Sequence, residues 1–153
     1  MVLVRDEGGY FDGSIQTVWR FLNSGDPHAA AHTSTRNRQV KPVGDITNLV
    51  SLERNWKGKW VKVVNRVTVL PPLGTMLEAL EGPFAGTKAF TVYTPEGART
   101  RVDVYGEFLS PSIPPAEVKD AAIEWLDESY REDASAIRSM QGGQRDDPTH
   151  APR

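Results

Sequence analysis

The chain has 153 residues, of which 39% are hydrophobic and 25% charged, and its formal net charge is −2. This length suits one domain, and so small a net charge gives no electrostatic reason to bind nucleic acid or an anionic membrane. The sequence contains no cysteine, which excludes disulfides, thiol catalysis and thiolate metal sites. The N-terminus is charged too early for a signal peptide, and no apolar run could span a membrane. We therefore expect a cytoplasmic protein without membrane insertion.

The first part of the chain predicts one strand and two short helices. Residues 2–7 form a strand-like segment that Gly8-Gly9 should end. Ser14 is suited to cap a short helix, which residues 23–27 interrupt. Residues 28–32 then predict one or two further helical turns, with Pro27 in a first-turn position. The apolar residues of the first helix would share one face: Ile15, Val18, Trp19 and Leu22.

From residue 33 the sequence changes to the alternating pattern of a sheet. Short runs of turn residues separate six strand-like segments: 33–41, 46–54, 60–70, 75–81, 87–94 and 98–109. Connections this short imply that neighbouring strands are antiparallel. In two of the segments a set of apolar residues should form one dry face: Val61, Val63, Val67 and Val69, and Val102, Val104 and Phe108.

Residues 114–140 predict one long amphipathic helix. Pro114-Pro115 suits its first turn, and Gly142-Gly143 suits its end. At about 1.5 Å per residue it would be roughly 40 Å long, so a broad sheet should lie against it. Residues 1–141 would then form the domain, and 142–153 a disordered tail. Small or apolar residues recur three and four positions apart: Val118, Ala122, Trp125, Leu126, Ser129, Ala136, Ile137 and Met140.

A family resemblance spans residues 1 to 141. The stretches that carry it are Tyr10-Phe11 through Val18-Trp19 to Phe21-Leu22, Gly82 through Thr87, the hairpin Thr94-Pro95-Glu96-Gly97 with Thr100, and Glu132-Asp133 with Ile137 and Met140-Gln141. In this order they resemble the SRPBCC superfamily of START-type, birch-pollen-allergen-like and polyketide cyclase-like proteins. The resemblance implies an α+β helix-grip fold, in which a curved antiparallel sheet of about seven strands wraps around the long C-terminal helix. Two short helices follow the first strand.

The resemblance also implies an internal apolar cavity between helix and sheet. We therefore expect the protein to bind a small hydrophobic molecule such as a lipid or a polyketide, without a cofactor, for transport, cyclisation or dehydration. Asn65 would be costly beside its valine neighbours unless it is paired or meets a ligand, by about 1–3 kcal/mol. The alternative is that the aromatic residues simply fill the core. The expected ligand-binding residues are Asn65, Phe90, Val102, Val104, Phe108, Ala122, Trp125 and Ser129.

Two histidines and one aspartate are candidate metal ligands. His28 and His32 are four positions apart, so both imidazoles can face one point, and Asp133 falls on the buried face of the long helix. The arrangement resembles the catalytic domain of Rieske-type oxygenases, whose two histidines and one aspartate bind non-haem iron. This chain has three residues between the histidines where that family has four, and no cysteine for a Rieske cluster. Non-haem iron or zinc is thus the alternative to a cofactor-free protein.

Other interpretations remain open beside these two. Both histidines could lie at the surface or the pocket rim, with Asp133 paired to Arg131 or Arg138. An enzyme should carry converging polar groups inside the cavity, whereas a carrier should have an almost wholly apolar lining. A protein-interaction domain, resembling the activators of the Hsp90 chaperone, should expose an apolar patch outside the cavity.

Overall fold

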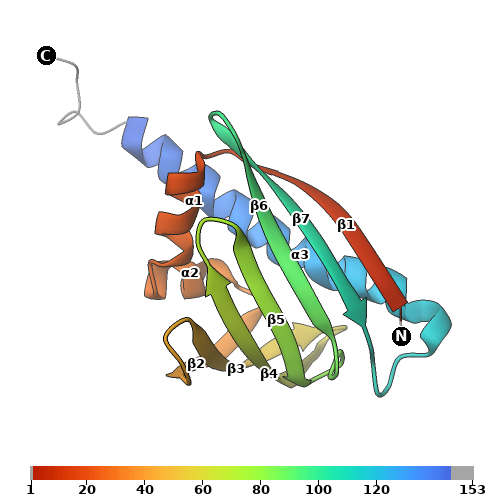
Figure 1. Ribbon diagram of the computed structural model, residues 1–153. Coiled ribbons are helices and arrows are strands. Elements are labelled where there is room, and N and C mark those ends of the chain that lie inside the picture. The colour runs from red at the N-terminus through yellow and green to blue at the C-terminus, as the bar shows by residue number, and fades with distance from the viewer. Residues whose placement is uncertain (1, 146–153) are drawn as a thin grey trace, which may run out of the picture.

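The computed structural model describes residues 2–145 as an antiparallel sheet that curves around one long helix (Figure 1). Every strand from β2 to β6 pairs with the next in the chain, as the short turns require, and β1 closes the order by pairing with β7. The sheet has seven strands in the order β1-β7-β6-β5-β4-β3-β2, which confirms the predicted helix-grip architecture. The elements are β1 Val2–Phe11, α1 Ile15–Leu22, α2 Asp26–Ala31, β2 Thr35–Pro42, β3 Thr47–Trp56, β4 Lys59–Leu70, β5 Gly74–Glu81, β6 Lys88–Glu96, β7 Arg99–Phe108 and α3 Pro115–Arg145.

Strand β1 is longer than the sequence predicts. It does not end at Gly8-Gly9 but continues to Phe11, with a shift of register between Asp6 and Gly9. Gly9 has φ +134°, and a Cβ atom there would lie 2.7 Å from the hydroxyl oxygen of Tyr130. That hydroxyl donates a hydrogen bond to the carbonyl of Tyr10 at 2.8 Å. The glycine therefore makes a bulge that lets the strand approach α3, rather than a chain break.

Helix α3 is also longer than predicted. Gly142-Gly143 does not end it, since the helix runs to Arg145 and residues 142–145 belong to it rather than to a tail. Glycine inside a helix costs only about 1 kcal/mol relative to alanine, which one additional turn can tolerate. The rest of the predicted tail, 146–153, lies outside the described residues. At 1.5 Å per residue the 31-residue helix is roughly 45 Å long.

Two apolar clusters join α3 to the sheet. In the first, Val118 and Ala122 pack with Val104 and Phe108, as the meeting of helical and strand periods predicts, and Trp125 packs against them. In the second, Ile137 and Ala134 pack with residues of β1, β6, β7 and α1. This second cluster places α1 beside the C-terminal half of α3 (Figure 1). It is therefore the cluster that positions the two short helices.

The two short helices follow β1 as predicted. The Ser14 side chain caps α1 by accepting a hydrogen bond from the backbone N–H of Thr17 at 3.3 Å. Val18 and Trp19 are buried as expected, but Phe21 is buried too, so that α1 is enclosed on a wider face than the sequence pattern indicates. No helix within residues 2–145 is long and apolar enough to cross a membrane.

Candidate metal centre and ligand cavity

The structure brings His28, His32 and Asp133 together. The Nε2 atoms of His28 and His32 lie 3.2 and 2.9 Å from Asp133 Oδ1, and 3.2 Å from each other. All three side chains are only 16–19% exposed. Asp133 does not pair with the neighbouring arginines, because Arg131 pairs with Asp127 and Arg138 with Asp12.

Both imidazoles are held on the side that faces away from Asp133. The Nδ1 atom of His28 lies 3.1 Å from the carbonyl oxygen of Leu22, the last residue of α1. The Nδ1 atom of His32 lies 3.2 Å from Oε1 of Glu132. A carbonyl and a carboxylate oxygen can only accept, so each of these two contacts is a hydrogen bond when Nδ1 carries the proton. Each neutral ring then presents the lone pair of Nε2 to Asp133.

Three atoms with lone pairs therefore lie close together: Nε2 of His28, Nε2 of His32 and Oδ1 of Asp133. Within residues 2–145, the buried Oδ1 atom of Asp133 has no hydrogen-bond donor. Three such atoms about 3 Å apart repel one another unless a cation lies between them, and the cation is either a proton on one imidazole or a metal ion. Ligand atoms at 2.0–2.2 Å from a metal and about 90° apart are separated by roughly 3.0 Å. The observed separations of 2.9–3.2 Å fit such a metal site.

The charges of the site stabilise a cation. Burial lowers the pKa of His32, but the close contacts of the ring with the carboxylates of Asp133 and Glu132, together with their charges, outweigh this effect and raise the pKa above its ordinary value. Burial raises the pKa of Asp133, but its contacts with His28 and His32 outweigh burial and keep it below the ordinary range of a carboxyl. Asp133 is therefore ionised at neutral pH.

We expect the metal-free protein to become less stable as the pH rises above about 6.5. A raised pKa of His32 in the folded state gives stability that is fully present below the unfolded-state pKa of about 6.5 and lost as the pH rises through the folded-state pKa. Urea unfolding with a chelator present measures the loss. His32→Gln should remove this part of the pH dependence, and an unchanged dependence would contradict the assignment. Metal affinity should change in the opposite direction, because protons compete with the ion.

The fold explains why α2 holds the histidines in place. Pro27 lies in the first turn of this six-residue helix, and His32 is its C-cap, so the two imidazoles leave the same side of one turn. The ring of Phe21 lies edge-on to that of His28, with centroids 5.0 Å apart. The buried face of α1 thus forms one wall of the site.

A cavity of about 80 Å³ lies beneath α3, about two turns before Asp133. Four of the predicted ligand-binding residues line it: Asn65, Val104, Phe108 and Trp125. The other lining residues are Val63, Leu126, and residues of β5, of β6 and of the turn between them, including Glu81 and Phe84. Asn65 is half-buried on this wall. The lining is thus mainly apolar with a few polar groups, as in many ligand sites.

The other four predicted residues do not line the cavity. Phe90 is 48% exposed, because Ala89 and Thr91 of the same strand face the cavity and alternation turns Phe90 outward. Val102 is buried in the second apolar cluster. Ala122 is fully buried against the sheet, and Ser129 is half-buried on α3. The alternation around Phe90 was a signal in the sequence, but the small Ala89 and polar Thr91 masked it.

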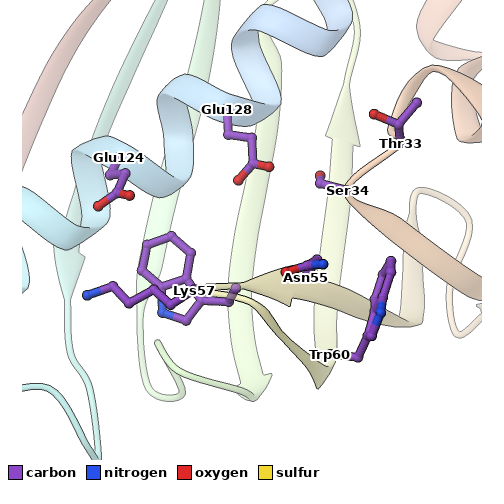
Figure 2. Close-up of a pocket in the computed structure, with 8 residues that line it drawn as sticks. Thr33, Ser34, Asn55, Lys57, Trp60, Glu124 and Glu128 are labelled. Carbon is purple, nitrogen blue, oxygen red and sulfur yellow. The ribbon is translucent and has the colours of Figure 1, made fainter.

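An open groove of about 320 Å³ lies between α3 and the β3–β4 hairpin (Figure 2). Glu124 and Glu128 point into it from α3, and Trp60 stands at its other end (Figure 2). The buried guanidinium of Arg54 stacks on the ring of Trp125 at 3.6 Å, and its Nη2 donates to the Trp125 carbonyl at 2.6 Å. The sequence did not single out Arg54 or this groove, although Glu124 and Glu128 have the spacing of one helix face.

Comparison with known proteins supports the fold. No family model matches the sequence, and no curated protein matches it significantly. Among solved structures, the Zhui aromatase/cyclase from Streptomyces sp. R1128 has a TM-score of 0.74 at 14% identity, over 99% of this chain and 100% of that one. TTHA0849 from Thermus thermophilus has a TM-score of 0.72 at 15% identity, over 91% and 97%. A START superfamily protein from Mycobacterium smegmatis has a TM-score of 0.66 at 14% identity, over 91% and 97%. The chain therefore has the same helix-grip fold as these proteins.

Proposed function

We propose that this protein binds one divalent first-row transition-metal ion through His28, His32 and Asp133, and that the ion acts on a small, mostly apolar molecule held beneath α3. The observation that carries the proposal is the convergence of two Nε2 atoms and one carboxylate oxygen within 3.2 Å. The Nδ1 atoms of the two histidines contact other partners, the carbonyl of Leu22 and the carboxylate of Glu132. The three atoms are therefore available as ligands without rearrangement.

The ligand set narrows the class of metal. Two imidazoles and one carboxylate, without sulfur, suit Fe(II), Zn(II) or Co(II) better than calcium, which takes oxygen ligands. Three protein ligands leave further coordination positions for water or substrate, which is typical of catalytic rather than structural sites. When bound, the ion would polarise a substrate or water oxygen as a Lewis acid. Asp133 would neutralise part of its charge, and Phe21 would keep water from one side of the His28 ring.

The apolar molecule is supported by the cavity. Its volume of about 80 Å³ is below the roughly 150 Å³ of a cavity that holds benzene, so side chains must move to admit a ring. The similar Zhui protein is an aromatase/cyclase, which supports a polyketide-like ligand as the class to test first. Mass spectrometry of molecules extracted from the purified protein would identify the ligand.

The metal half of the proposal is tested on protein that has been stripped with a chelator. Co(II) should bind at one ion per chain, and the visible absorption of the bound ion reports the ligands around it. The double variant His28→Ala/His32→Ala should show neither the uptake nor the spectrum. Equal uptake by the wild type and the double variant would contradict the proposal.

A further inference from the structure

Glu132 accepts four hydrogen bonds beside the metal centre. They come from His32 Nδ1 at 3.2 Å, the backbone N–H of Ser34 at 2.9 Å, Ser34 Oγ at 2.8 Å and Thr33 Oγ1 at 3.3 Å. The side chain is only 13% exposed. Burial raises its pKa, but the hydrogen bonds from Ser34 and His32 outweigh burial and keep the pKa below the ordinary value. The carboxylate is therefore ionised and saturated with donors.

We infer that Glu132 is a positioning residue that fixes the tautomer and the orientation of His32, an inference that rests on the proposed function. A carboxylate that accepts from Nδ1–H leaves the lone pair of the ring on Nε2, which is the atom that faces Asp133. Without Glu132 the proton could move to Nε2, and His32 would no longer offer a lone pair to the ion.

The geometry of α3 makes this role specific. Glu132 and Asp133 are consecutive, so their side chains leave the helix about 100° apart and reach His32 from two directions. Glu132 contacts Nδ1 and Asp133 contacts Nε2 of the same ring. The ring of His32 is thus held between two neighbouring carboxylates of one helix.

The contacts to Thr33 and Ser34 extend this control to the backbone. These residues follow His32 directly and precede β2, so Glu132 ties the segment that carries one ligand to the helix that carries another. His28 has its own support in the carbonyl of Leu22. Each imidazole therefore has one acceptor behind it, and only that of His32 is a side chain that can be changed by mutation.

Glu132→Gln should weaken Co(II) binding by about 10- to 100-fold, the range seen when such outer-shell partners are removed. The variant keeps the size of the side chain, but its NH₂ group would face the donors of Ser34 or His32. Glu128→Gln is the matched control, because Glu128 lies one turn earlier on α3 and contacts Arg54 rather than a histidine. Its Co(II) affinity should equal that of the wild type.

The tautomer itself can be read by ¹⁵N NMR of the imidazoles in metal-free protein, at a pH where the rings are neutral. The wild type and Glu128→Gln should show His32 protonated at Nδ1, whereas Glu132→Ala should show a mixture of tautomers. An unchanged Nδ1–H tautomer in Glu132→Ala, or an unchanged Co(II) affinity in Glu132→Gln, would overturn the inference. Because the tautomer is measured without metal, this experiment tests the role of Glu132 independently of whether the protein binds a metal ion. A wild type that binds no Co(II) would overturn the proposed function alone.

Discussion

Asp133→Asn should abolish the stabilisation of this protein by a divalent metal ion. At 100 times its Kd, an ion that binds only the folded state stabilises it by about 2.7 kcal/mol, which corresponds to a rise in Tm of about 5–10 °C for a chain of this size. The variant replaces the anionic oxygen that lies 2.9 and 3.2 Å from the two imidazoles by a neutral amide. Thermal unfolding of chelator-stripped protein with and without Zn(II) or Co(II) measures the difference.

The metal-free variant should fold at least as well as the wild type near pH 8. The amide NH₂ of asparagine can donate to the lone pair on Nε2 of His28 or His32, so a donor takes the place of the Asp133 oxygen, which has no hydrogen-bond donor within the described residues. This separates the loss of a ligand from a general loss of stability. Asp127→Asn, a substitution in the ion pair with Arg131 on the same helix, should keep the full metal-induced shift. A full shift in Asp133→Asn would contradict the metal site.

Much of the fold could be predicted from the sequence because its signals are local. Alternation and turn residues mark the strands, and the spacing of Val118, Ala122 and Trp125 marks the buried face of α3. The errors at Gly8-Gly9 and Gly142-Gly143 share one cause: glycine weakens an element without necessarily ending it. Whether it makes a bulge or a break depends on tertiary contacts, such as the approach of Tyr130 to Gly9.

The candidate metal site could be predicted from the sequence for a similar reason. The spacing of His28 and His32 and the helix face of Asp133 are local patterns, and the fold needed only to bring two helices together. The hydrogen-bond partners of the Nδ1 atoms could not be predicted. The partner of His28 is the backbone carbonyl of Leu22, which no residue type in the sequence marks. Glu132 belongs to a stretch that carries the family resemblance, but nothing in the sequence indicates its contact with His32. Its role depends on where β2 begins, which only the folded chain defines.

The outer face of the sheet shows where residue type misleads and strand parity decides. Phe90 pairs across strands with Met76 and Tyr105, and these three residues form an exposed row on the side away from α3. An aromatic residue in a strand of a helix-grip fold suggests a cavity wall, but parity decides its direction. That such a row belongs to a protein-interaction domain stays a prediction.

Ile137→Ala should destabilise the protein by about 2–5 kcal/mol, because Ile137 is fully buried in the second apolar cluster. It packs there with Phe11, Val18 and Phe21, and thereby connects α3 to β1 and α1. The truncation removes apolar contacts and leaves a void that these rings can fill only in part. Urea unfolding with metal removed, analysed with a common m value, measures the loss.

Ile137→Val is the matched control, since it removes a single methyl group and should cost only about 0.5–1.5 kcal/mol. The cost in Ile137→Ala should also reach the metal site. Ile137 lies one turn after Asp133, and the α1 helix that it contacts ends at the carbonyl that supports His28. In the fraction that remains folded, the Co(II) spectrum of Ile137→Ala should therefore differ from that of Ile137→Val. An alanine variant that costs no more than the valine variant would show that α1 is held in place by other contacts.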